Sequence, residues 1–153
     1  MDAQRETIDL LREETLPAVC AIDADSFSCP WSERDFRELL ALPYNHFYVL
    51  RRGERVAGYV GVSCICGSAD ILNIAVHPDF RRQGAGRALM EHAHAEAAAM
   101  GAQELLLEVR RSNTAAQALY RSLGYTEIAQ RKNYYRHPTE DALIWRLCPL
   151  QSI

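Results

Sequence analysis

The spacing of hydrophobic residues along the chain switches between a helical period and a strand-like period. Apolar residues three and four positions apart predict helices, and short runs rich in aromatic and β-branched residues predict strands. The predicted helices are Leu16–Phe27, Ser32–Leu42, Gly84–Met100 and Asn113–Leu123. The predicted strands are His46–Arg51, Val56–Cys66, Asp70–Val76, Leu105–Val109, Thr126–Tyr134 and Ala142–Leu147.

The order of these elements predicts the fold class. Two helices precede an antiparallel meander of three strands, and a helix, a strand, a helix and a final hairpin follow. This order predicts an α/β (α+β) fold with a central, mostly antiparallel mixed sheet flanked by helices. No repeat, low-complexity tract or linker divides the 153 residues, so we expect one domain over residues 1–153.

Several ends of these elements carry recognisable signals. Ser32 with Asp35 resembles a capping box at a helix start, and Pro17 is tolerated in a first helical turn. Ser112 or Asn113 is expected to cap the last helix. Gly58 and Gly61 interrupt a strand and are expected to be weak points or bulges.

Composition and charge narrow the classes of partner. Hydrophobic residues make up 48% of the chain and the net charge is -3, so the chain can bury a core and carries no large basic cluster. We therefore expect no nucleic-acid binding. The N-terminus leads into no apolar signal-peptide core, and no run of about 18 apolar residues is present. We expect a cytoplasmic protein without membrane attachment.

The five cysteines form no framework that suggests disulfides or a metal. Their number is odd, and Cys64-Ile65-Cys66 lacks the C-x-x-C spacing of zinc and redox motifs. His92 and His94 have no accompanying acidic ligand set. We expect reduced thiols, no metal and no covalent acyl-cysteine intermediate.

The most informative segment runs from Val76 to Leu89, with the sequence V-H-P-D-F-R-R-Q-G-A-G-R-A-L. It follows a predicted strand and opens a helix, whose first N–H groups lack partners and favour anions. Gly84 and Gly86 remove side chains that would hold a phosphate away. Neither the Walker nor the Rossmann pattern fits. The pattern indicates a phosphate or pyrophosphate site, although G-x-G by itself also fits a tight strand-to-helix turn.

This segment resembles the acetyl-coenzyme A signature of the GCN5-related N-acetyltransferase (GNAT) family. The resemblance extends over nearly the whole chain and includes Glu108 and the segment N-T-A-A-Q-A-L-Y-R-S-L-G-Y that begins at Asn113. It implies acetyl-coenzyme A as co-substrate, with Asn113 as a further contact. It implies that pantetheine lies beside Ile74, Ala75 and Val76, and that the pyrophosphate lies on the backbone of Arg82, Gln83, Gly84, Ala85, Gly86 and Arg87.

Four further segments are similar to the bacterial ribosomal-protein-alanine N-acetyltransferases within this family. They are F-S-C-P-W-S from Phe27, L-N-I-A-V from Leu72, L-E-V-R from Leu107 and R-K-N-Y-Y from Arg131. The similarity implies that the acceptor is a protein N-terminus, namely the N-terminal alanine of a small-subunit ribosomal protein. Cys29 before Pro30 is a minor departure from the pattern.

Acetyl transfer to such an amine needs a base, because an N-terminal amine has a pKa of about 7.7–8.0 and is largely protonated near neutral pH. Glu108 is the one charged residue in the apolar run from Leu105 to Val109. From the pattern alone, Glu108 is equally a strand-end carboxylate paired with Arg110 or Arg111. The family resemblance favours the role of general base.

The leaving thiolate needs a proton donor, and Tyr120 on the last predicted helix is the candidate. A tyrosine there also fits an anchor between helix and sheet, and the resemblance again favours the catalytic role. The backbone N–H of Val76 is a candidate donor to the thioester oxygen. His77 is interpreted as a loop residue rather than a base.

Phe27, Trp31, Tyr134 and Tyr135 are predicted to line a groove for an extended acceptor peptide. Ordinary packing under the loops is the alternative interpretation of these aromatic residues. Two other functions also remain open at this stage. One is acetylation of a small amine, a lysine side chain or an aminoglycoside, and the other is a coenzyme-binding regulatory module without turnover.

Overall fold

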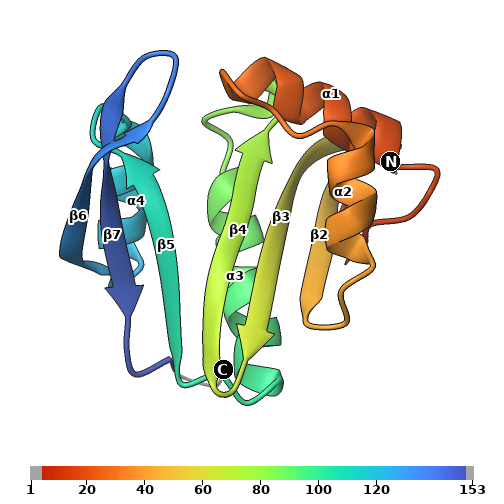
Figure 1. Ribbon diagram of the computed structural model, residues 1–153. Helices are drawn as coiled ribbons and strands as arrows, with labels where there is room; N and C mark the ends of the chain where they lie inside the picture. The colour runs from red at the N-terminus through yellow and green to blue at the C-terminus, as the bar shows by residue number, and fades with distance from the viewer. Residues whose placement is uncertain (1–4, 151–153) are drawn as a thin grey trace. The chain divides into compact units, whose positions relative to one another are not determined.

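The computed structural model describes residues 5–150 of the chain (Figure 1). Its helices are α1 (Leu16–Ser26), α2 (Glu33–Leu40), the short 3-10 helix η2 (Pro78–Phe80), α3 (Ala85–Ala99) and α4 (Thr114–Ser122). Its strands are β1 (Glu6–Leu10), β2 (Asn45–Arg52), β3 (Arg55–Ile65), β4 (Ser68–Val76), β5 (Glu104–Arg110), β6 (Thr126–Tyr135) and β7 (Glu140–Leu147).

The strands form a mixed sheet in the order β1-β2-β3-β4-β5-β7-β6. Strand β4 pairs with β5 in parallel, whereas β1 with β2, β2 with β3, β5 with β7 and β6 with β7 pair antiparallel. The predicted α/β fold with a mostly antiparallel mixed sheet and flanking helices is therefore confirmed.

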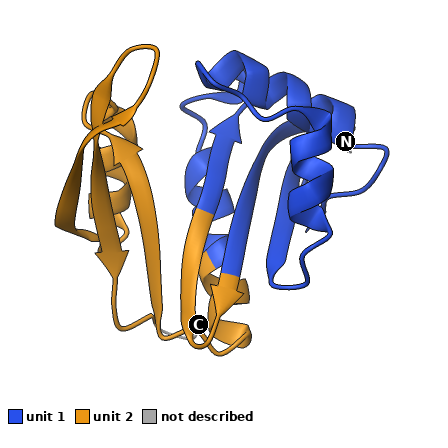
Figure 2. Ribbon diagram, in the orientation of Figure 1, with its two compact units in different colours: residues 1–63, 72–93 blue, residues 64–71, 94–153 orange. Residues whose placement is uncertain are grey.

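By its internal contacts the chain divides into two compact units, each of which is described by itself (Figure 2). Unit 1 comprises residues up to 63 together with 72–93, and unit 2 comprises 64–71 together with 94 onwards. Strands β3 and β4 and helix α3 each contribute to both units. The single domain over residues 1–153 stays a prediction.

The sheet of unit 1 is covered on both faces, as the alternation of side chains along β2 requires. Phe47 and Val49 face a core that α1 and α2 complete with Leu16, Val19, Ile22 and Phe36. Tyr48 points to the opposite face, where its ring lies 4.6 Å from that of His92 on α3. Burial on both faces gives this unit its stability.

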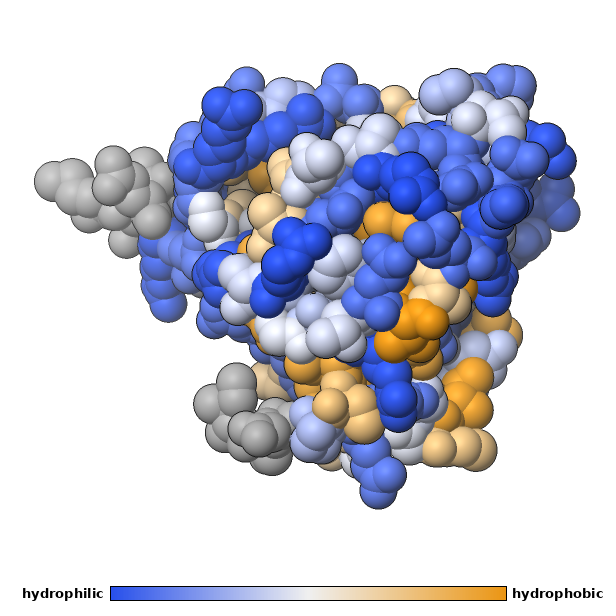
Figure 3. Space-filling model, turned by 90° about the vertical axis from the view of Figure 1, so that its left-hand side faces the viewer, coloured by the Kyte–Doolittle hydropathy of each residue, from blue (hydrophilic) through white to orange (hydrophobic). Residues whose placement is uncertain are grey.

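Unit 2 packs α4 and the end of α3 against β5 and β7. The buried residues of unit 2 include Ala97, Leu105, Leu107, Val109, Tyr120, Tyr125, Leu143 and Trp145. Edge strand β6 is exposed at every position before Tyr135. The side of the molecule seen in Figure 3 is accordingly mostly hydrophilic, with small separate apolar patches.

The predicted element ends are largely confirmed. The capping box of Ser32 and Asp35 is present, Pro17 lies in the first turn of α1, and Asn113 is the N-cap of α4. Strand β1 was not predicted from the sequence. It is a five-residue edge strand that forms by pairing with β2 along its length.

The prediction of bulges at Gly58 and Gly61 is only half right. The register shift between β2 and β3 falls next to Gly58, whereas Gly61 pairs regularly with Phe47. A Cβ at Gly61 would lie 2.4 Å from the Phe47 ring. Gly61 therefore makes room for an aromatic side chain in the core rather than for a bulge.

Candidate active site

The predicted phosphate loop joins the end of β4 to the start of α3 in unit 1. Gly84 has a φ of 83°, which glycine adopts without strain, and Arg82 has a φ of 62°. Ala88 N donates to Gly84 O at 3.0 Å, so the N-terminus of α3 lies at this loop. A Cβ placed on Gly84 would meet nothing within 4 Å. The loop thus offers open space and N–H groups at a helix N-terminus, which fits an anionic diphosphate.

Side chains hold this loop in place from the outside. The Gln83 amide donates to Asp79 O at 3.1 Å, and Arg52 donates to both the side-chain and backbone oxygens of Gln83 at 2.8 Å. Arg81 Nε donates to Val76 O at 3.1 Å. The loop conformation is therefore set by the protein before any ligand binds.

The predicted pantetheine strand is the last part of β4. Ala75 is buried, and Ile74 and Val76 are half-buried. A Cβ on Gly58 would lie 2.7 Å from Ala75 O, so β3 carries a glycine where a side chain would clash with the backbone of β4. His77 follows the strand as the N-cap of η2, and its Nδ1 accepts a hydrogen bond from Asp79 N at 3.0 Å. This contact agrees with the interpretation of His77 as a loop residue.

In unit 2, Glu108 lies on β5 opposite Ile144 of β7. The buried residues Leu105, Leu107 and Val109 alternate with it, so its side chain leaves on the other face and is 32% exposed. Arg131 approaches Glu108 to 3.7 Å. The other ion pairs nearby join Arg110 to Glu140 and Arg111 to Asp141.

Aromatic hydroxyls surround this carboxylate. A hydrogen bond with Glu108 raises the pKa of Tyr134, and burial together with the nearby Glu108 charge raises the pKa of Tyr135 to about 12. The Tyr134 and Tyr135 rings are 5.2 Å apart in an edge-on arrangement. Tyr134 is 45% exposed, so a partner molecule has access to it.

Tyr120 is held in the core by α4 and is only 5% exposed. Burial raises its pKa to about 12. Its ring lies 5.8 Å from that of Tyr125, and it is near enough to Tyr135 to raise the pKa of that phenol. Glu108, Tyr120, Tyr134 and Tyr135 therefore form one cluster of titratable groups, the Glu108 cluster.

Asn113 has a structural role that competes with the predicted coenzyme contact. Its side-chain oxygen accepts a bond from Ala116 N at 3.1 Å and caps α4. The side-chain amide is the group with which Asn113 can contact a ligand. The coenzyme contact of Asn113 stays a prediction.

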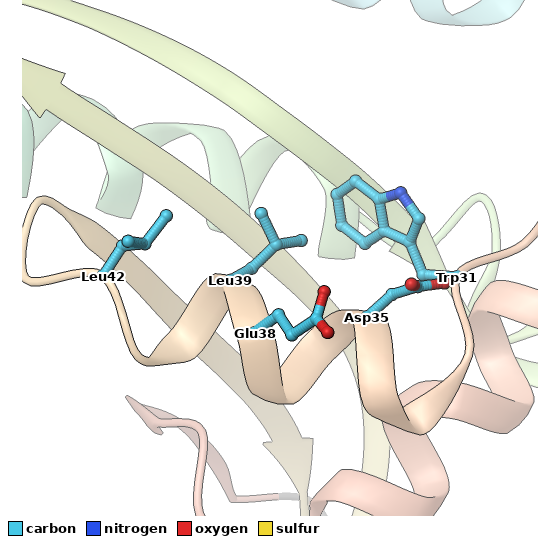
Figure 4. Close-up of a pocket in the computed structure, with 5 residues that line it drawn as sticks. All are labelled: Trp31, Asp35, Glu38, Leu39 and Leu42. Carbon is cyan, nitrogen blue, oxygen red and sulfur yellow. The ribbon is translucent and has the colours of Figure 1, made fainter.

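The predicted acceptor segment Phe27–Trp31 lies between α1 and α2. The Trp31 ring packs edge-on against Phe36 and Phe47 with centroids 5.3 and 6.3 Å apart. Both Phe27 and Trp31 are half-buried against the core of unit 1. Figure 4 shows Leu39 between Trp31 and Leu42 in a pocket that Asp35 and Glu38 also line. Packing and an accessible pocket wall are therefore both present at Trp31.

The predicted residues thus gather in two groups. Unit 1 contains the phosphate loop, the end of β4 and the segment Phe27–Trp31, and unit 2 contains Asn113 and the Glu108 cluster. The sequence interpretation assigned no role to Arg131 or to a hydrogen-bonded set formed by the buried Asp23 and Tyr59 and the partly buried Asn73. Asp23 is one of two aspartates, with Asp25, among the mostly apolar residues of α1, and this pattern was the available signal for it.

Among residues 5–150, no group of three or more His, Cys, Asp and Glu side chains is placed to hold a metal ion. The five cysteines are free thiols. Within the same range, no helix has the length and apolar character needed to cross a membrane.

Comparison with known proteins agrees with the family resemblance found in the sequence. Residues 16–125 match the model of the acetyltransferase (GNAT) family. The chain is 42% identical over 145 residues to the [ribosomal protein bS18]-alanine N-acetyltransferase of Escherichia coli K12, covering 92% of this chain and 96% of that protein. It is 32% identical to the N-alpha-acetyltransferase RimI of Mycobacterium tuberculosis, covering 95% and 94%.

Solved structures agree with these matches. The crystal structure of the ribosomal-protein-S18-alanine N-acetyltransferase from Escherichia coli superposes with a TM-score of 0.89, 38% identity and 97% coverage of both chains. Ard1 from Thermoplasma volcanium gives 0.87 at 26% identity, covering 95% and 99%. Arabidopsis thaliana NAA60 in complex with acetyl-CoA gives 0.85 at 14% identity, covering 94% and 98%, and shows the shared fold alone.

Proposed function

The chain belongs to the acetyltransferase (GNAT) family and is an acyl-CoA-dependent N-acetyltransferase, and from this premise we propose that it acetylates the N-terminal alanine of ribosomal protein bS18. The observation that carries the proposal is the 42% identity to an enzyme of that specificity over 92% of this chain. The two substrates, acetyl-CoA and a ribosomal protein, meet in the cytoplasm, where we propose that the enzyme acts.

Acetyl-CoA supplies the acetyl group as a thioester. In this proposal its diphosphate is bound by the backbone N–H groups from Arg82 to Arg87, and its pantetheine arm lies along Ile74, Ala75 and Val76. The glycine at position 84 and the open space beside it support the diphosphate assignment. Asn113 is a further proposed contact.

Glu108 is the proposed general base. An ammonium group cannot attack a carbonyl carbon, so the acceptor amine must first lose a proton, and the partly exposed carboxylate of Glu108 takes it. The amine nitrogen then bonds to the acetyl carbon, and the bond from that carbon to sulfur breaks. The backbone N–H of Val76 is the proposed donor to the thioester oxygen during this step.

Tyr120 is the proposed acid. Its pKa of about 12 keeps the phenol protonated throughout the neutral range, so it can donate to the sulfur as negative charge develops there. Phe27, Trp31, Tyr134 and Tyr135 are proposed to bind the acceptor peptide. The partial exposure of Tyr134 and the pocket beside Trp31 support this assignment.

The test is a turnover assay with acetyl-CoA and a peptide that carries the N-terminal sequence of mature bS18, read by mass spectrometry. We expect a single acetyl group on the α-amine. Glu108→Gln and Tyr120→Phe should each lower kcat about 10²–10⁴-fold, while the Kd for acetyl-CoA stays within about twofold. Glu104→Gln on the same strand and Tyr44→Phe on the surface are matched controls that should keep the wild-type rate.

Three results would change the proposed acceptor, activity or mechanism. Acetylation of a lysine side chain in a peptide with a blocked N-terminus, without α-amine transfer, would favour a different acceptor. Tight binding of acetyl-CoA without transfer to any amine would favour a regulatory module. Wild-type rates in both the Glu108 and the Tyr120 variants would remove the proposed mechanism while leaving the acceptor assignment in place.

A further inference from the structure

A fully buried carboxylate lies in unit 1, outside the residues proposed for catalysis. Asp23 on α1 is 0% exposed, among the apolar residues that α1 buries. Burial raises the pKa of this carboxyl, and its hydrogen bonds with Tyr59 and Trp31 act in the opposite direction. A polar group at such a position is costly unless its hydrogen bonds are satisfied, so its presence calls for a reason.

Asp23 accepts hydrogen bonds from three other parts of the chain. Its Oδ2 accepts from the backbone N–H of Trp31 at 2.7 Å. Its Oδ1 accepts from the Tyr59 hydroxyl on β3 and from Asn73 Nδ2 on β4, the latter at 3.0 Å. Asn73 Nδ2 also lies 3.0 Å from the Tyr59 hydroxyl. One carboxylate thus joins α1, β3, β4 and the segment before α2.

The positions of these partners relate the network to the reaction. Trp31 ends the proposed acceptor segment, and Asn73 directly precedes Ile74–Val76, the proposed strand for the acetyl donor. The bonds from Asp23 therefore connect the backbone on the acceptor side with the strand on the donor side. Both ends of the connection belong to unit 1.

We propose that Asp23 is a positioning residue that holds the Phe27–Trp31 segment in a fixed place relative to the donor strand β4, and so prepares the acceptor site. This inference rests on the proposed function, since it assigns that segment to acceptor binding. A segment fixed before binding loses less conformational freedom when the peptide arrives, which lowers KM for the peptide.

The donor and acceptor count explains why position 23 needs a carboxylate. Two oxygens accept from Trp31 on one side and from Tyr59 and Asn73 on the other. Asparagine has the same shape but only one acceptor oxygen, so Asp23→Asn keeps the volume and loses one side of the connection. The double variant Asp23→Asn/Asn73→Asp restores the balance of donors and acceptors. The amide at position 23 can accept a hydrogen bond from Trp31 N–H and donate one to the carboxylate at position 73. That carboxylate can also accept a hydrogen bond from the Tyr59 hydroxyl.

The experiment compares wild type, Asp23→Asn, Asn73→Asp and the double variant in the peptide turnover assay. Loss of a hydrogen bond to a charged group corresponds to about a tenfold or larger change in an equilibrium constant. We expect KM for the peptide to rise about tenfold or more in Asp23→Asn, with the Kd for acetyl-CoA within about twofold. The double variant should return KM to within about threefold of wild type.

A second measurement follows the backbone of the Phe27–Trp31 segment directly. Hydrogen exchange measured by mass spectrometry should show faster exchange across Phe27–Trp31 in Asp23→Asn, and slower exchange again in the double variant. Thr15→Val is the matched control, because it removes the side-chain bonds with Arg12 at the other end of the same helix. It should lower the melting temperature and leave KM for the peptide unchanged.

An unchanged peptide KM in Asp23→Asn, with only the melting temperature lowered, would overturn the inference and leave the proposed function intact. Equal rises of KM in Asp23→Asn and Thr15→Val would also overturn it. If the wild type acetylates a different amine, the proposed acceptor is wrong, and the same comparison on that amine decides the role of Asp23. No transfer by the wild type to any amine would overturn both proposals.

Discussion

Replacing His94 should change how the stability of the protein depends on pH. His94 lies near the middle of α3, is 7% exposed, and its Nε2 is 2.7 Å from the Tyr125 hydroxyl. Tyr125 in turn packs against Tyr120, the proposed acid. Burial disfavours the charged imidazolium and lowers the pKa of His94 from its ordinary value of 6.5 to about 4.

The sign and size of the effect follow from proton linkage. Between pH 6.5 and pH 4 the unfolded chain binds a proton at His94 that the folded chain excludes, so the folded state loses stability as the pH falls. The full difference corresponds to about 3 kcal/mol, and about 2 kcal/mol of it should be lost between pH 7.5 and pH 5. Well above pH 6.5 His94 is neutral in both the folded and the unfolded chain, so its full contribution to the free energy of unfolding is present.

Urea unfolding followed by circular dichroism at pH 7.5, 6 and 5 measures this difference. Other groups also titrate in this range. The informative quantity is therefore the change in unfolding free energy with pH in wild type, compared with the same change in His94→Gln, which has no imidazole at position 94. The variant should lose about 2 kcal/mol less than wild type between pH 7.5 and pH 5. Tyr125→Phe should keep the wild-type slope, because burial rather than the hydroxyl contact lowers the pKa. Parallel curves for wild type and His94→Gln would refute the reasoning.

Three further substitutions test the local geometry. Gly58→Ala puts a Cβ 2.7 Å from Ala75 O. It should lower the free energy of unfolding by about 1–3 kcal/mol in thermal unfolding and weaken acetyl-CoA binding measured by calorimetry. Unchanged values of both would contradict the close approach of β3 to β4. Ser32→Ala removes the capping box of α2 and should cost about 1 kcal/mol in urea unfolding, whereas an unaltered midpoint would mean that the cap contributes nothing. Gly84→Ala forces a positive φ on a residue with a Cβ. It should lower the free energy of unfolding by about 1–2 kcal/mol and weaken acetyl-CoA binding. A calorimetric Kd for acetyl-CoA equal to that of wild type would contradict the proposed diphosphate loop.

Local patterns were enough to place most of the elements. The helix predicted over Gly84–Met100 is observed as Ala85–Ala99, and the one predicted over Asn113–Leu123 as Thr114–Ser122. These segments carry their own signals, namely a helical period and a glycine at the C-terminal end. Strand β1 carries too weak a signal, since five residues with little burial form a strand only by pairing with β2.

The candidate catalytic residues could be selected from the sequence but not placed by it. The apolar run around Glu108 and the resemblance to a family pointed to Glu108 and Tyr120, while Arg131 next to Glu108 and the burial of Tyr120 needed coordinates. Residue type and local order are properties of the chain. Distances between residues far apart in sequence depend on how the strands pair.

Asp23 shows this division most clearly. The sequence by itself determined a mostly apolar helix with two aspartates, Asp23 and Asp25, a glycine-containing loop that suits a phosphate, and membership of an acetyltransferase family. Only the tertiary structure decided that the carboxylate of Asp23 meets Tyr59 and Asn73, which lie 36 and 50 residues away. The physical reason is that hydrogen bonds form between groups that are close in space, and the sheet brings these strands under α1.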